Sequence, residues 1–129
     1  MPSQTISISL QSSDKSVGQS TTVTDAVGKA IDETLAPSTT NTEVDVVLKA
    51  AQTKSLFMQS VGGDLTIKTN STSAPGDTVT MTAGEVLFWS TVGVIGANPF
   101  PSADVTKLYL SSTAGTTFNL RAIVTATNG

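Results

Sequence analysis

The chain has 129 residues and a mass of 13.2 kDa, the size of one domain around one hydrophobic core (residues 1–129). It has neither cysteine nor histidine, which excludes disulfides, thiolate metal sites and the nucleophile–histidine pairs of common hydrolases. The net charge is −3 and the seven basic residues are scattered, which argues against nucleic acid as a partner.

The chain has no apolar run long enough to cross a bilayer, and residues 1–10 lack the basic and apolar parts of a secretion signal. We therefore expect no membrane partner and a soluble protein that is made and kept in a cytoplasm. Charged residues are only 13% of the chain while serine and threonine are abundant, a composition typical of β-sheet exposed to water. Nothing in it requires a cofactor, and none is expected.

Alternation of apolar and polar residues predicts half-buried β-strands, and it begins with Ile6, Ile8 and Leu10. The polar stretch at residues 11–22 follows, and it has two interpretations. It belongs either to an extended arm that crosses to a neighbouring molecule or to a plain first hairpin with a loose loop, which we favour. Residues 1–20 are therefore predicted to form an extended arm or the first strand.

The segment around Ile31 and Leu35 fits helical spacing, so a short helix is one interpretation. However, Glu33 alternates with these two residues, Gly28 disfavours a helix, and a proline follows the segment. We therefore predict a strand at residues 29–35.

The alternation recurs four more times along the chain. Its apolar positions are Val44, Val46 and Leu48, then Leu65 and Ile67, then Val79 and Met81, then Phe118, Leu120, Ala122 and Val124. Runs at residues 56–58, 86–89 and 108–110 are apolar on both faces, which is typical of central strands or of strands that pack against a second subunit. The prediction is an all-β fold, an antiparallel β-sandwich or jelly roll of about eight or nine short strands.

Two pairs of carboxylates, Asp32–Glu33 and Glu43–Asp45, come closest to the acid and base of a glycosidase. We favour solvent-facing charges instead, because Glu43 and Asp45 alternate with apolar residues of a predicted strand. Without histidine the usual general base is also missing. We therefore predict that the chain is not an enzyme and has no catalytic residue.

Asp64, Asp77 and Asp104 each lie beside a predicted turn, where carboxylates suit either a calcium site or ordinary turn hydrogen bonds. A dedicated calcium loop places several oxygen ligands at alternate positions, and none of these three turns has that pattern. Turn chemistry is the favoured interpretation, and no metal site is predicted.

The long connection at residues 91–104 is unusual because it is apolar, whereas a solvated loop should be polar. Its apolar side chains are covered either by their own domain, over the end of the sandwich, or by another subunit. Trp89 leads into the connection, and a large aromatic residue is a typical interface centre. In the second interpretation the interface residues are Trp89, Val92, Val94, Ile95 and Phe100.

Four segments between residues 54 and 110 carry a resemblance that rests on a strand-turn-strand motif. They are residues 54–60 (KSLFMQS), 64–70 (DLTIKTN), 83–89 (AGEVLFW) and 103–110 (ADVTKLYL). Together they resemble small virion proteins of tailed bacteriophages. The resemblance spans residues 41–127, contains no catalytic signature and leaves residues 1–40 without a counterpart.

The resemblance implies a β-sandwich or jelly-roll protein that binds and stabilises a phage capsid as a decoration or cement protein. Its partners are then the major capsid protein and further copies of itself, in a dimer or trimer. Its place is the capsid exterior of a virion made in the host cytoplasm. No functional residue carries over, because such proteins act through surfaces that vary. One alternative is a tail or fibre component, and another is a carbohydrate-binding module, which needs exposed aromatic residues.

Overall fold

The computed structural model describes residues 2–11, 16–25, 27–91 and 97–128, and within these ranges the chain forms ten β-strands and no helix. The strands are β1 (Ser3–Gln11), β2 (Ser16–Thr24), β3 (Val27–Leu35), β4 (Thr39–Leu48), β5 (Thr53–Val61), β6 (Leu65–Thr69), β7 (Thr78–Met81), β8 (Val86–Ser90), β9 (Val105–Ser112) and β10 (Thr116–Val124). Accordingly, no described segment is a helix suited to crossing a membrane.

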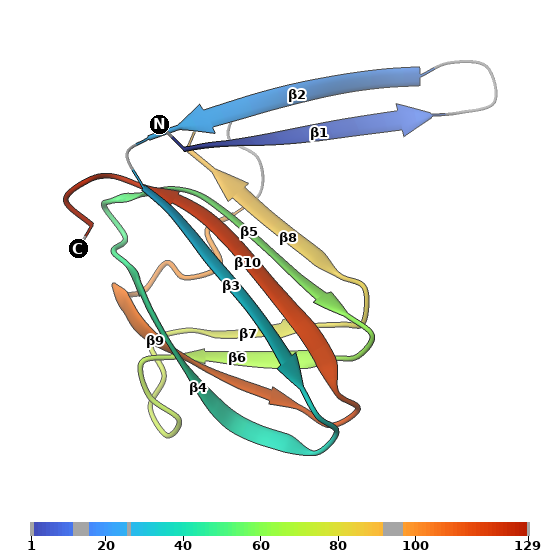
Figure 1. Ribbon diagram of the computed structural model, residues 1–129, viewed down its shortest axis with the longest axis vertical. Helices are drawn as coiled ribbons and strands as arrows, with labels where there is room; N and C mark the ends of the chain where they lie inside the picture. The colour runs from blue at the N-terminus through green and yellow to red at the C-terminus, as the bar shows by residue number, and fades with distance from the viewer. Residues whose placement is uncertain (1, 12–15, 26, 92–96, 129) are drawn as a thin grey trace.

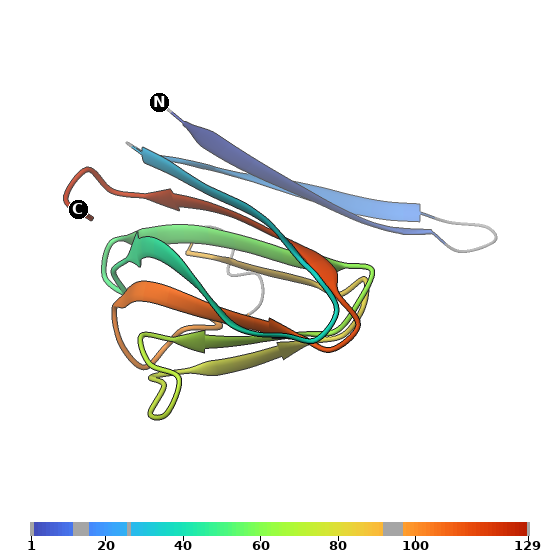
Figure 2. The same ribbon diagram turned by 60° about the horizontal axis from the view of Figure 1, so that its bottom comes forward.

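Eight of the strands form two four-stranded antiparallel sheets that face each other (Figure 1, Figure 2). The strand order is β3-β10-β5-β8 in what we call the first sheet and β4-β9-β6-β7 in the second sheet. From β3 to β10, consecutive strands lie in opposite sheets except for the pair β6 and β7. The predicted all-β fold, an antiparallel β-sandwich, is therefore confirmed.

The hydrophobic core lies between the two sheets and takes one side of each alternating strand. On β10, Phe118 and Leu120 are fully buried, while the alternating residues Asn119 and Arg121 lie on the outer face. Full burial of one such apolar side chain contributes about 1.5–3 kcal/mol. The buried members of the core are Ile31, Leu35, Val46, Leu48, Leu56, Met58, Leu65, Ile67, Met81, Phe100, Val105, Leu108, Leu110, Phe118, Leu120, Ala122 and Val124.

The runs that are apolar on both faces occupy two kinds of position. Residues 56–58 lie in β5 and residues 108–110 in β9, and both strands are central in their sheets, which is the first of the two interpretations. Residues 86–89 lie in β8, which is instead an edge strand of the first sheet. A central place therefore does not explain why β8 is apolar on both faces.

The uncertain segment at residues 29–35 is a strand, β3, which begins two residues earlier, at Val27. The described residues form ten strands where about eight or nine were predicted, and the polar stretch at residues 11–22 contributes to the additional strand β2. The sequence SVGQSTTVT has little apolar alternation, so β2 owes its place to backbone pairing with β1. The predicted buried face of Ile6, Ile8 and Leu10 lies outside the described side chains.

Strands β1 and β2 form an antiparallel hairpin separate from both sheets. Their pairing runs without interruption from Ser3 opposite Thr24 to Gln11 opposite Ser16. Nine residues of strand extend about 30 Å. Both views show the far end of this hairpin projecting away from the sandwich, while its base lies next to β3 and β10 (Figure 1, Figure 2). Residues 3–11 are thus the first strand, and residues 16–20 begin its partner in the hairpin.

Two tight turns meet at one end of the sandwich and require glycine there. A Cβ atom at Gly63 would lie 2.1 Å from the carbonyl oxygen of Gly115, closer than any side chain can approach backbone. Gly115 itself has a φ of +84° and is packed against Pro37 and the carbonyl group of Leu35. This contact holds the β5–β6 connection against the β9–β10 connection.

Gly63→Ala is expected to lower the free energy of unfolding by about 2–3 kcal/mol, because backbone must move to admit the methyl group. Urea denaturation followed by circular dichroism measures the effect. Gly28→Ala is the control, since its new Cβ would meet nothing closer than 3.5 Å and the stability should change by about 0.5 kcal/mol at most. Equal effects of the two substitutions would contradict the close approach at Gly63.

Candidate interaction surfaces

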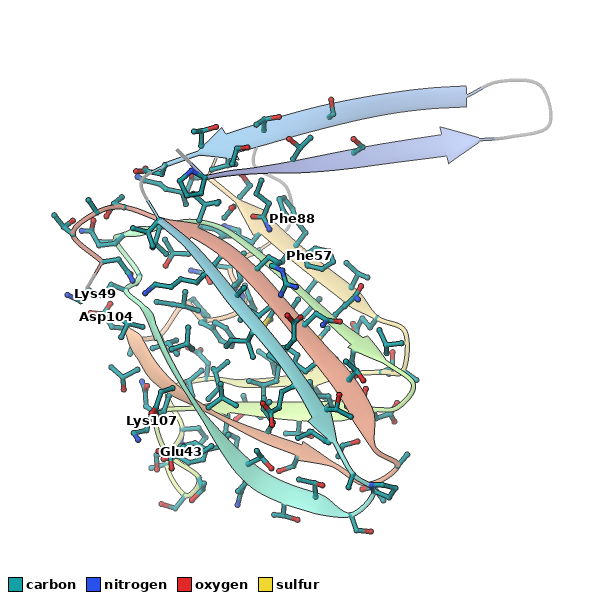
Figure 3. The ribbon with its side chains drawn as sticks, in the orientation of Figure 1. Glu43, Lys49, Phe57, Phe88, Asp104 and Lys107 are labelled. Carbon is teal, nitrogen blue, oxygen red and sulfur yellow. The ribbon has the colours of Figure 1, made fainter. Side chains whose placement is uncertain are left out.

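The carboxylates of Glu43 and Asp45 on β4 both pair with Lys107 on the neighbouring strand β9. The Lys107 ammonium group forms an ion pair with Glu43 (Figure 3) and a second with Asp45, at 3.2 Å. The side chains of all three residues are exposed. The hydrogen bonds to Glu43 and then to Asp45 raise the pKa of Lys107 above its ordinary value. Both carboxylates are therefore paired with the same ammonium group. This arrangement fits exposed surface charges better than the acid and base of a catalytic site.

The three turn carboxylates, Asp64, Asp77 and Asp104, accept hydrogen bonds from separate segments. The bonds join Asp64 to the N–H of Ala83 (2.9 Å), Asp77 to the N–H and Oγ–H of Ser102 (3.1 and 2.7 Å), and Asp104 to the N–H of Ala50 (2.8 Å). Each carboxylate therefore holds loops together. Within the described part of the chain, no three acidic side chains converge on a point where a metal ion would fit.

A polar network crosses the outer face of the first sheet from β3 to β5. Arg121 donates to both carboxylate oxygens of Asp32 at 2.9 and 3.1 Å, and the Asn119 amide donates to the same carboxylate at 2.6 Å. Gln59 in turn donates to Asn119 at 2.9 Å. The hydrogen bond from Asn119, followed by that from Arg121, lowers the pKa of Asp32 below its ordinary value. A carboxyl group in this setting stays ionised and is a poor general acid.

Two phenylalanine residues lie beside this network on the same outer face. Phe57 on β5 stands directly opposite Arg121 on β10 and, on its other side, opposite Phe88 on β8. Both aromatic side chains are half-buried, and Figure 3 shows them close together near the end of the sheet that lies under the hairpin. A row of one cationic and two aromatic side chains therefore runs across three strands toward the β8 edge.

The residues predicted to form an interface have different environments. Phe100 is 4% exposed and belongs to the core, so its own domain covers it and it is not available to a partner. Trp89 is partly buried against the same core. Val92, Val94 and Ile95 lie outside the described residues. For Phe100 the fold supports the first interpretation of the apolar connection, in which the loop folds back over the sandwich, because the space between the sheets at that end is filled by this ring.

The base of the hairpin is fixed to the first sheet by polar contacts. The Gln4 amide donates to the carbonyl group of Arg121 at 3.2 Å and accepts a hydrogen bond from the buried Ser55 hydroxyl. Asp25 N–H donates to the Pro2 carbonyl group at 3.2 Å, closing the hairpin where it joins β3. An open cleft of about 520 Å³ separates residues 2–5 from β3 and β10. The hairpin is therefore anchored at one end.

Besides the three turn carboxylates, other side chains fasten the loops and the hairpin, and sequence reasoning assigned no such role to Asn70, Asn128 or Gln4. Asn70, at a φ of 67°, accepts hydrogen bonds from the N–H of Thr106 and donates to the carbonyl group of Asp104, both at 2.8 Å. Asn128 is 1% exposed and bridges the backbone of residues 47 and 49. An asparagine after a strand was a usable signal for Asn70, because asparagine tolerates positive φ. Gln4 and Asn128 had no local signal, since their partners are distant in sequence.

Comparison of the chain with protein-family models, with curated proteins and with solved structures found no match. The resemblance to phage virion proteins stays a prediction.

The Asp32 carboxyl group is expected to titrate below its ordinary pKa of 3.8 in an NMR pH titration, and Asn119→Ala should raise that value because it removes the strongest hydrogen bond. A folded-state pKa below the unfolded one means that the interaction stabilises the fold above the unfolded pKa. That stabilisation is lost as the pH falls through the folded value. A titration at or above the ordinary value would contradict the network and reopen an acid role for Asp32.

Proposed function

We propose that the chain is a non-catalytic structural protein of a tailed-bacteriophage virion, which binds the capsid exterior as a decoration or cement protein. Its partner is the major capsid protein of the same particle, and it acts as a homo-oligomer, a dimer or trimer. The observation that carries the proposal of a binding role is the hairpin β1–β2, which projects from the sandwich and is anchored at one end. The capsid as the partner comes from the sequence resemblance.

The hairpin has the physical properties of an attachment arm. An isolated two-stranded ribbon is marginally stable in water, so a long one is best explained by a partner that covers it. Natural exposed edges are normally protected by charged residues, proline or bulges. The strands SQTISISLQ and SVGQSTTVT have no charged residue and no proline, and their register is uninterrupted. Such edges favour the addition of a strand from another protein, in which backbone hydrogen bonds supply the affinity.

A capsid role agrees with the rest of the molecule. A protein that stabilises a shell needs only to bind the assembled form better than its loose parts, and repetition over many copies multiplies a small contact. The alternation of consecutive strands between two four-stranded sheets also supports assigning the sandwich to the jelly-roll class, in which viral capsid domains are common. The acidic net charge of −3 suits a place away from packaged nucleic acid.

The carbohydrate-binding alternative has one feature in its favour, which is the outward-facing pair of Phe57 and Phe88 beside the polar side chains of the first sheet. Aromatic faces with amide and carboxylate neighbours suit sugar rings. Both rings are half-buried, however, and the polar groups next to them already bond to one another. Binding on a glycan array that is lost in Phe57→Ala would favour this module over the capsid role.

Mass spectrometry and electron cryomicroscopy of the phage particle test the proposal directly. Density for the sandwich on the outer surface of the capsid is the expected result. Density in the tail would favour the tail or fibre alternative, and absence of the chain from the particle would end the virion proposal.

The double substitution Ser7→Lys with Ser20→Glu is expected to weaken binding to particles that lack this protein by about tenfold or more. Ser7 and Ser20 are exposed and opposite each other, so the new charges can pair, keep the hairpin and protect its edges. Co-sedimentation measures the binding. The control is Thr34→Lys with Thr117→Glu, a matched cross-strand pair on the sandwich, which should bind as the wild type does. Unchanged binding by the hairpin variant would refute the arm.

A further inference from the structure

We propose that the edge of β8 facing away from β5, where no described strand pairs with it, is a self-association surface. Residues 86–88 of two copies would pair there antiparallel about a twofold axis at Leu87. The pairing would join the first sheets of two molecules into one eight-stranded sheet. This inference rests on the homo-oligomer in the proposed function, for which it names the interface, and it is independent of the capsid role of the hairpin.

The first support is the contrast between β8 and the other three edge strands of the sandwich. β3 carries Lys29, Asp32 and Glu33, and β4 carries Glu43 and Asp45 with two register irregularities. β7 is only four residues long. These are the usual protections against pairing with another chain. β8 has the sequence VLFWS, with no charge, no proline and an unbroken register with β5.

The acidic residue that precedes β8 does not protect this edge. The Glu85 carboxylate accepts a hydrogen bond from the N–H of Thr82 at 2.9 Å, so it is held in the turn before the strand. An edge that is uncharged over its whole length and apolar from Val86 to Trp89 is the kind on which another strand adds.

The backbone hydrogen bonds of the two residues that flank β8 show which way its N–H and carbonyl groups point. The backbone carbonyl group of Glu85 accepts a hydrogen bond from the N–H of Ser60, and the N–H of Thr91 donates to the carbonyl group of Lys54. The backbone groups of residues 85 and 91 therefore point to β5. Because these directions alternate along an antiparallel strand, the backbone groups of residues 87 and 89 also point to β5. Those of Val86 and Phe88 point to the opposite edge. An axis at Leu87 sets Val86 opposite Phe88 of the second copy, and Phe88 opposite Val86. The two pairs then exchange four backbone hydrogen bonds.

The side chains of β8 also match those of a second β8 in this register. On the outer face, Val86, which is 50% exposed, would be covered by Phe88 of the second copy. The row of Arg121, Phe57 and Phe88 would continue into the neighbouring molecule. On the inner face, the partly buried Leu87 would meet its own counterpart, which extends the core contact across the axis. An antiparallel pair of identical strands has twofold symmetry by construction, and this is why a second copy is the partner proposed.

Substitution at the edge tests the pairing in the full-length chain. Val86→Lys places a charge on the edge without disturbing the core, and it should raise the dissociation constant of the dimer about tenfold or more. Val61→Lys is the matched control, because Val61 is 51% exposed on the same sheet but lies on β5, away from this edge. Light scattering should give twice the chain mass for the wild type and Val61→Lys, and the single mass for Val86→Lys. A monomeric or trimeric wild type, or equal masses for the two variants, would overturn the proposal.

A disulfide tests the register, since the chain has no cysteine of its own. Leu87→Cys would face Leu87→Cys of the second copy at a separation of about 4.5 Å between Cα atoms, which permits a disulfide. Mild oxidation should therefore give a covalent dimer. Val79→Cys is the control, because Val79 is also a partly buried residue of an edge strand packed on the core, in the short strand β7. Cross-linking of Leu87→Cys no faster than that of Val79→Cys would rule out the twofold axis at Leu87.

Discussion

The placement of β10 between β3 and β5 is the constraint on which the rest of the structure depends. Leu120 pairs in register with Ile31 on one side and with Met58 on the other, so the last strand joins the first and third strands of the sandwich. All three side chains lie on the core face, and a shift of one residue would turn them outward. Because these partners are far apart in sequence, the first sheet is complete only when the whole chain is in place.

The register of the core strands also determines which side chains lie on the outer face of the first sheet. Once Leu120 faces inward, Arg121 and Asn119 must face outward, next to Phe57 and Gln59 of β5 and Asp32 of β3. The polar network is thus a consequence of core burial. Its members bond mainly to one another, which holds the carboxylate ionised and leaves the face as a packed surface. On the second sheet the same logic places Lys107 between two carboxylates.

The exposed strand edges of the molecule differ in whether they carry features that prevent pairing with another chain. Three edges of the sandwich are protected by charge, irregular register or short length, whereas the β8 edge and both edges of the hairpin are not. A protein that protects some edges and not others can stay folded and still offer defined places for pairing. The β8 edge is short and part of a rigid sheet, which suits a symmetric contact. The hairpin is long and anchored at one end, which suits reach toward a different partner.

The sequence by itself determined the all-β class and nearly all of the sandwich strands, because alternation with a period of two is a local consequence of having one buried face. It also indicated turn roles for Asp64, Asp77 and Asp104, since these residues lie beside turns in the sequence. Strand β2 escaped prediction because its pairing with β1 depends on backbone and not on apolar pattern. Only the tertiary structure decided that Phe100 fills its own core and that β8, apolar on both faces, lies at an edge. Those outcomes depend on which distant strands become neighbours, and the order of strands in a sheet is a property of the whole chain that no local run of residues encodes.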